Sequence, residues 1–169
     1  TRILFPEAFG LMALVTVVTV GLSLFSDVGI GPSIAQNKRG DDPAFLDTAW
    51  TIQVIRGFGL WALTALLAWP AAAFYGAPEL LVYLPVAGAG LAIAGFNPTR
   101  IETAHRHLLS GWVTVLDLGG QVIGLAAMIA LALATQSVIA LVLGGVIQAA
   151  AKLALCHFGL PGTANRFRW

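Results

Sequence analysis

Long stretches without a charged residue alternate along the chain with short segments that hold nearly all of the charge. The uncharged stretches run from Ala8 to Ser26, Gly57 to Pro78, Leu80 to Thr99 and Leu118 to Ala151. A helix rises about 1.5 Å per residue, so roughly 20 apolar residues cross a hydrocarbon core about 30 Å thick. Each of the first three stretches therefore fits one membrane-spanning helix.

The fourth stretch is long enough for two helices. Thr135, Gln136 and Ser137 lie near its middle and predict a tight turn between them. The apolar runs are continuous, whereas the strands of a membrane barrel alternate polar and apolar residues. The sequence thus predicts an all-α, polytopic membrane helix bundle of about five transmembrane helices, near residues 8–25, 51–73, 80–96, 114–134 and 138–155.

Composition supports this class and excludes others. Of the 169 residues, 58% are hydrophobic and only 10% are charged, against about 25% charged in an average soluble domain. So few charges exclude intrinsic disorder and a nucleic-acid binder with a basic stripe. The single cysteine, Cys156, excludes a disulfide framework and a CxxC metal site.

The basic residues fall on one side of the predicted topology. If five helices alternate in direction, segments 26–50 and 97–113 and the C-terminal tail share a side, with Arg2 on the other. The positive-inside rule makes the shared side cytoplasmic. Eight of the nine basic residues lie there: Lys38, Arg39, Arg56, Arg100, Arg106, Lys152, Arg166 and Arg168.

The same topology places the N-terminus outside, although the chain starts at Thr1 and not at a methionine. We therefore expect residues 1–169 to form a single transmembrane bundle that is a fragment of a larger protein, with an earlier helix absent.

Three polar residues lie near the cytoplasmic ends of predicted spans. Arg56 follows Trp50 into the second span, where its guanidinium either reaches the headgroups or faces a water-filled cavity and binds an anion. Gln53, three residues earlier, shares its helix face. Asp27 ends the first span, where it either caps backbone N–H groups or belongs to a polar cavity.

Further polar residues flank the later spans. The positive charges of Arg100 and Arg106 are suited to attract phosphate or lipid headgroups. Asp117 in the fourth span could form an ion pair with Lys152 in the fifth. His105 and His107 are two residues apart and lie on different helix faces, so no metal site is predicted. The chain shows no HExxH, P-loop or recognisable Ser-His-Asp spacing. We therefore expect a protein without a cofactor that moves a substrate and is not an enzyme.

Small residues mark one face of the fourth span. Gly120 and Gly124 form a GxxxG motif, which lets two helices approach closely. The motif indicates either tight packing within the chain or a dimerisation face.

Several motifs resemble those of bacterial oligosaccharide flippases, the Wzx-like proteins of the multidrug/oligosaccharidyl-lipid/polysaccharide exporter superfamily. The resemblance extends along the whole chain to the LPG sequence at residues 160–162 and the terminal RFRW. The motifs are FPEAFGL at residues 5–11, SLFSDVGIG at 23–31, QNKR at 36–39, DTAW at 47–50 and FYGAPEL at 74–80.

The resemblance implies part of the N-terminal lobe of a two-lobe transporter, with the second lobe as its missing partner. Such a protein would lie in the bacterial inner membrane, contact membrane lipid and carry lipid-linked oligosaccharide across by alternating access. The residues it implies for binding the lipid pyrophosphate or an anionic sugar are Arg56, Lys38, Arg39, Arg100 and Arg106.

Two other functions fit the same residues. One is a structural or assembly subunit whose small-residue faces dock on a partner, without transport activity. The other is a membrane-embedded transferase acting on a lipid phosphate, although no acid/base pair for that reaction is evident in the sequence.

Overall fold

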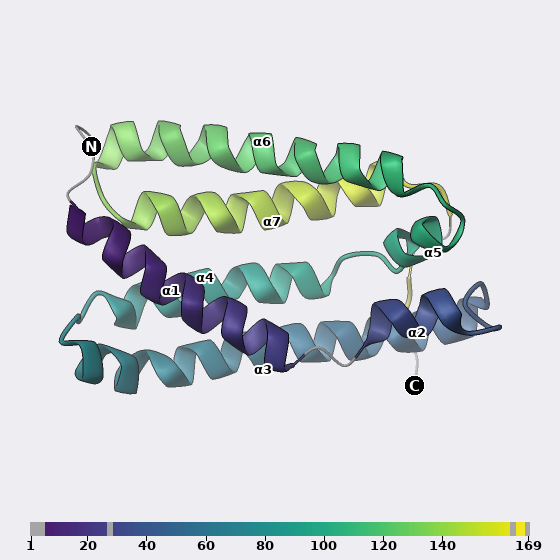
Figure 1. The fold of residues 1–169 in the computed structure, drawn as a ribbon, viewed down its shortest axis with the longest axis horizontal. Helices are drawn as coiled ribbons and strands as arrows, with labels where there is room; N and C mark the ends of the chain where they lie inside the picture. The colour runs from purple at the N-terminus through teal and green to yellow at the C-terminus, as the bar shows by residue number, and fades with distance from the viewer. Residues whose placement is uncertain (1–5, 27–28, 163–164, 168–169) are drawn as a thin grey trace.

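The computed structural model describes residues 6–26, 29–162 and 165–167, and helices make up the regular structure of these residues (Figure 1). Asp27 and Arg168 lie outside the described residues. The helices are α1 (Pro6–Phe25), α2 (Ile30–Gln36), α3 (Pro43–Tyr75), α4 (Leu80–Gly95), α5 (Arg100–Arg106), α6 (Ser110–Thr135) and α7 (Ile139–Gly159).

The predicted all-α, polytopic bundle is confirmed, and each of the five predicted segments is largely helical. Within the described ranges, α3, α6 and α7 are long and apolar enough to cross a membrane, and α4 with α5 would make a fourth span bent by 59°. By length and hydropathy the structure therefore has three or four candidate membrane spans, fewer than the five predicted. The shortfall has a geometric cause, because α4 and the apolar part of α1, Phe9–Leu24, are each about 24 Å long.

Helix α3 begins well before its predicted start near residue 51. Asp42 is its N-cap, with Oδ1 accepting a hydrogen bond from the Ala44 N–H at 2.9 Å, and Pro43 occupies the first helical position. Both residue types favour a helix start at these positions. At the other end of α3, Gly76 adopts φ 62° and terminates the helix.

The short helices gather at one end of the bundle. Helices α2 and α5 lie at the same end as residues 165–167, while the α3–α4 and α6–α7 connections lie at the opposite end (Figure 1). We call the first of these the basic end, because Lys38, Arg39, Arg100, Arg106 and Arg166 lie there. The three segments predicted to share a side therefore do meet at one end of the molecule.

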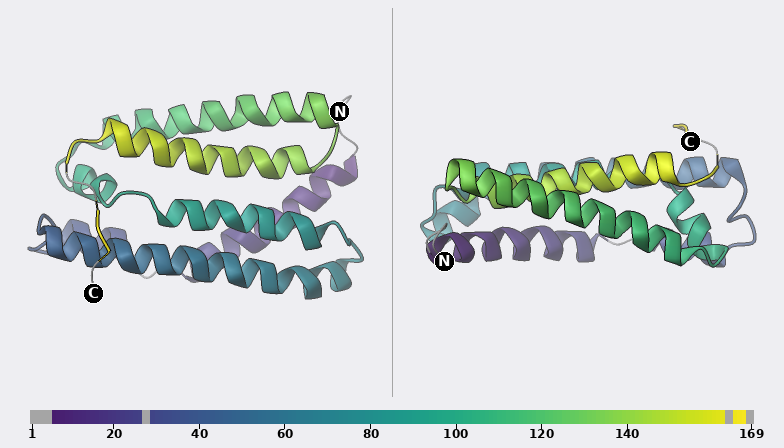
Figure 2. Two further views of the ribbon diagram at one scale, coloured as in Figure 1. Left: turned by 180° about the vertical axis from the view of Figure 1, so that it is seen from behind. Right: turned by 90° about the horizontal axis from the view of Figure 1, so that it is seen from above.

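The long helices pack as pairs. Helix α3 packs along α4, and α6 packs along α7, with α4 and α7 in contact between the two pairs. Helix α1 starts beside the α6–α7 connection and crosses obliquely toward α3, on one side of the other helices (Figures 1 and 2). It packs on α4 and α3 through a cluster of Val15, Ala68, Ala72, Leu80 and Leu84.

Glycines allow the closest helix approaches. A Cβ atom added to Gly57 of α3 would lie 3.1 Å from the Gly95 Cα of α4. In the α6–α7 pair, a Cβ on Gly120 would lie 3.2 Å from the Lys152 Cα, and one on Gly124 would lie 2.4 Å from the Gln148 Cβ. The GxxxG motif is therefore used for packing within the chain.

Replacing Gly124 with alanine is expected to destabilise the α6–α7 pair. The new methyl group would collide with Gln148 of α7, and overpacking of this kind costs about 1–3 kcal/mol. Thermal unfolding in detergent micelles, followed by circular dichroism, measures the effect.

Gly111→Ala is the matched control, because nothing lies within 4 Å of a Cβ at that position of the same helix. It should raise the free energy of unfolding by about 0.5–1 kcal/mol through helix propensity alone. Equal responses of the two variants would contradict the close α6–α7 contact.

Candidate functional site

Arg56 lies at a small cavity between α1, α3 and α4. Its Nε donates to Ser26 Oγ at 2.9 Å, and one Nη donates to the backbone oxygen of Ser23 at 3.0 Å. The cavity has a volume of about 160 Å³, and Gln53, Gly57 and Leu91 also line it. Arg56 thus satisfies a carbonyl in the last turn of α1 and also faces an open space, so both alternatives for its guanidinium remain compatible with the geometry.

Gln53 binds the end of α4. Its Nε2 lies within hydrogen-bonding distance of the backbone oxygens of Ala94, Gly95 and Asn97, at 3.2–3.4 Å. One turn earlier on α3, the Trp50 indole N–H donates to the Phe96 oxygen at 3.3 Å. The last carbonyls of a helix have no partner within the helix, so these two side chains supply donors for α4.

Arg100 caps α7 from the start of α5. One Nη donates to the Leu160 oxygen at 2.7 Å and the other to the His157 oxygen at 3.3 Å. The Trp112 indole N–H donates to the Gly159 oxygen at 2.9 Å. A guanidinium at a helix C-terminus also complements the helix dipole. Arg100 therefore joins α5 to the end of α7, and Trp112 joins α6 to the same end.

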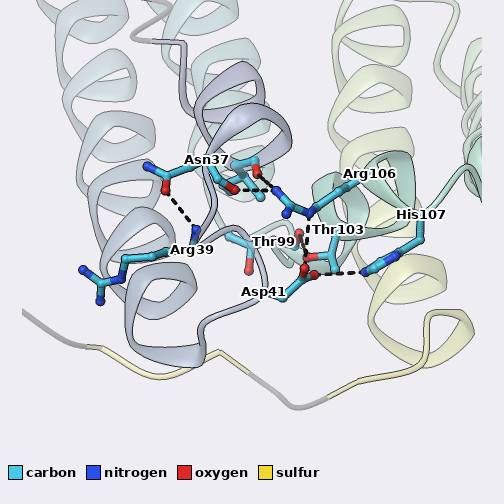
Figure 3. Close-up of polar contacts among 8 residues, drawn as sticks. Asn37, Arg39, Asp41, Thr99, Thr103, Arg106 and His107 are labelled. Carbon is cyan, nitrogen blue, oxygen red and sulfur yellow. Dashed lines mark hydrogen bonds and ion pairs between the residues drawn. The ribbon is translucent and has the colours of Figure 1, made fainter.

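Arg106 caps the C-terminal end of α2 in the same way (Figure 3). One Nη donates to the backbone oxygens of Ile34 and Asn37, and its Nε lies 3.2 Å from Asp41 Oδ2. His107 Nε2 lies 3.0 Å from the other oxygen of Asp41. These contacts fasten the connection between α2 and α3 to α5.

The other two cations of the predicted binding set are exposed. Arg39 lies 2.6 Å from Asp42 through one Nη, with 66% of its side chain exposed, and Lys38 lies beside it on the surface of the basic end. The Arg39 guanidinium, followed by the Ala44 N–H, holds the pKa of Asp42 below its ordinary value. The charged cap therefore contributes its full stabilisation above the pKa of a free aspartate, and this contribution is lost as the pH falls from that value through the lowered pKa of Asp42.

The C-terminal segment returns across the basic end to α3. Asn165 exchanges two hydrogen bonds with Thr99, at 2.7 and 3.1 Å, and the Arg166 N–H donates to Asp47 Oδ1 at 3.0 Å. Phe167 packs on Trp50 with ring centroids 4.8 Å apart. The tail thus joins α5 to the first part of α3.

The second polar site lies deeper, between α6 and α7. Lys152 Nζ lies 2.7 Å from Asp117 Oδ1, and Gln121 Nε2 donates to Asp117 Oδ2 at 3.2 Å. The pairing of Asp117 with Lys152 that the sequence suggested is present. Gly120 makes it possible, because its missing side chain brings the Lys152 backbone close to α6.

This ion pair borders a larger cavity of about 570 Å³. We call it the α1–α7 cavity, because its walls come from α1, α4, α6 and α7. Its polar lining residues are Thr16, Thr19, Asn97, Asp117, Gln121, Gln148 and Lys152. Ionisable groups inside a membrane are rare and usually face a cavity or a neighbouring helix. This cavity is therefore the strongest candidate functional site.

The predicted site residues fall into separate groups. Arg56 and Gln53 share the small cavity, Asp117 lies in the α1–α7 cavity, and Lys38, Arg39, Arg100 and Arg106 are distributed over the basic end. Gln121 and Gln148 were not predicted as site residues, and Lys152 was predicted only as a partner for Asp117. Their signal in the sequence is polar residues spaced four apart in each arm of one apolar hairpin, at 117 and 121 and at 148 and 152.

Arg100→Met is expected to lower the free energy of unfolding by about 1.5–3 kcal/mol, the size of a charge-assisted hydrogen bond. The loss follows because the carbonyls of His157 and Leu160 would lose their donors. Chemical unfolding in detergent micelles measures it.

Lys38→Met removes one positive charge from the same end of the molecule at an exposed position. It should leave the unfolding midpoint nearly unchanged. A loss of stability as large as that of Arg100→Met would mean that net charge, and not the cap on α7, is responsible.

Comparison with known proteins identifies the family. A family described as polysaccharide biosynthesis protein matches residues 1–164. Neither the curated proteins nor the solved structures contain a match to the chain. The match covers nearly all of the 169 residues, and it agrees with the multi-pass helical architecture. The chain belongs to the family of polysaccharide biosynthesis proteins.

Proposed function

We propose that the protein is a flippase that moves lipid-linked oligosaccharide across the bacterial inner membrane for polysaccharide export. The observation that carries this proposal is the α1–α7 cavity, which places charged and amide side chains inside a bundle of apolar helices. A polar cavity at membrane depth is what a hydrophilic substrate needs in order to cross hydrocarbon. Membership in a polysaccharide biosynthesis family supports the choice of substrate.

The arrangement of α1 supports alternating access. This helix packs on α4 and α3 and diverges from α6 and α7 toward the basic end (Figure 1). The α1–α7 cavity lies where the helices diverge. We propose that it opens at the basic end in this conformation, and that a second lobe of the same transporter completes the pathway.

Charge supports the proposed orientation. The described basic residues of the loops and tail gather at one end of the bundle, and the positive-inside rule assigns such an end to the cytoplasm. We propose that loops 26–50 and 97–113 and the tail are cytoplasmic. Lipid-linked oligosaccharide made in the cytoplasm would then meet the basic end first.

We propose that Arg56, Lys38 and Arg39 contact the lipid pyrophosphate. Lys38 and Arg39 are exposed, and Arg56 lines a cavity. Arg100 and Arg106 belong to the same proposed binding set, but both direct their guanidinium groups at backbone carbonyls. Their proposed contribution is a positive field and a fixed arrangement of the helix ends.

Charge removal at Arg56 tests this role. Arg56→Gln in the full-length protein should reduce polysaccharide export about tenfold, because a hydrogen bond to a charged group contributes about 1.5–3 kcal/mol. Arg56→Lys keeps the positive charge and should retain most of the export.

Export is measured in a strain that lacks the chromosomal copy, with the amount of folded protein in the membrane as the control. Undiminished export by Arg56→Gln would exclude the anion-binding role of Arg56. Equal loss in both variants would assign Arg56 to packing of α1 through Ser23 and Ser26.

A further inference from the structure

The α1–α7 cavity differs in charge from the basic end. Among its described lining residues the charged ones are Asp117 and Lys152, which neutralise each other across 2.7 Å. The basic end holds five described cations and four carboxylates, Asp41, Asp42, Asp47 and Glu102, with Lys38 and Arg39 exposed on its surface. These exposed cations can attract an anion, whereas the cavity offers no net charge for one.

The polar groups of the cavity remain accessible. The side chains of Lys152 and Asp117 are 35% and 36% exposed, although the pair lies between two apolar helices. Gln121 holds the second oxygen of Asp117, and Gln148 borders the same space one turn from Lys152. A carboxylate only accepts hydrogen bonds and an ammonium only donates them. A ligand group that fits both must donate and accept at once.

A hydroxyl group has this property, because it carries one donor and two acceptor lone pairs. An anionic group would be attracted by Lys152 but repelled by Asp117 at nearly the same place.

The size of the cavity and the small residues in its lining also fit a compact ligand. The volume of about 570 Å³ is within the range of roughly 300–1,000 Å³ found for small-molecule sites. Small residues from two helices make room beside the polar groups: Ala87, Gly90, Gly145 and Ala149.

We propose that the α1–α7 cavity binds an uncharged, hydroxyl-rich sugar unit of the substrate, with Asp117, Lys152, Gln121 and Gln148 as its hydrogen-bonding groups. This inference rests on the proposed function and specifies the sugar that it accepts. The ion pair sets the specificity, because its neutrality discriminates against sugars that carry a carboxylate.

The test measures which of two donors crosses a bilayer. The full-length protein is reconstituted in liposomes with two lipid-diphosphate-linked disaccharides, one built of neutral hexoses and one with a hexuronic acid as the second sugar. Protection from an added glycosidase reports movement of each donor. The quantity compared is the ratio of the neutral to the acidic rate, which does not depend on the amount of active protein.

The wild-type protein should prefer the neutral donor. Asp117→Asn leaves Lys152 without its counter-charge and should lower the ratio about tenfold, the effect of one hydrogen bond to a charged group. Gln148→Lys adds a positive charge while keeping the ion pair intact, so it should lower the ratio in the same direction even if Asp117→Asn folds poorly. Glu79→Gln, an exposed carboxylate beyond the far end of α3, is the control and should leave the ratio unchanged.

The outcomes separate this inference from the proposed function. If Gln148→Lys changes both rates equally, the cavity does not select the sugar by charge, and the inference is overturned while transport stands. If the wild-type protein moves neither donor, the proposed function itself fails.

Discussion

Unpaired backbone carbonyls at helix ends are the constraint on which the arrangement of this protein depends. Each helix leaves its last carbonyls without a partner, and α1, α4 and α7 all run toward the basic end. There the donors come from side chains on other helices: Arg56 serves α1, Trp50 and Gln53 serve α4, and Arg100 and Trp112 serve α7. Several long-range polar contacts of the described residues are therefore also helix caps. Three of the basic residues that predict membrane orientation, Arg56, Arg100 and Arg106, satisfy helix-end carbonyls in the folded chain.

The close α6–α7 contact creates the polar site inside the bundle. Gly120 and Gly124 bring the two helices close enough for Asp117 to reach Lys152, so small-residue packing creates the ion pair. Helix α1 packs on α3 and α4 and leaves this pair facing a cavity. Helix packing at one end and divergence at the other thus produce a polar site inside an apolar bundle, which is the feature that the proposed transport of a sugar uses.

Much of the fold follows from the sequence alone. Charge-free stretches located the long helices, and the Thr135–Ser137 turn was predicted because polar residues interrupt an apolar run. The start of α3 was missed, since the Asp42–Pro43 cap lies outside the apolar stretch that defined the span. The partners of the arginines were also not predictable. The sequence shows that Arg100 and Arg106 lie in the segment between two predicted spans, but it contains no information on which helix end comes within reach of their side chains. The Asp117–Lys152 pair was suggested, and only the register of the hairpin arms, which depends on glycine packing, fixes its distance.

Water access to the α1–α7 cavity tests the account most directly. Val146 lines the cavity, whereas Val122 is 65% exposed on α6 and lies outside it. The two valines are replaced singly by cysteine in the full-length protein, and inverted membrane vesicles are treated with a membrane-impermeant thiol reagent. Thiolate forms only where water is present, and the buried native Cys156 adds little background. The account predicts fast labelling of the Val146→Cys protein from the basic end and slow labelling of the Val122→Cys protein. Equal, slow labelling of both would contradict a hydrated cavity that opens toward the cytoplasm.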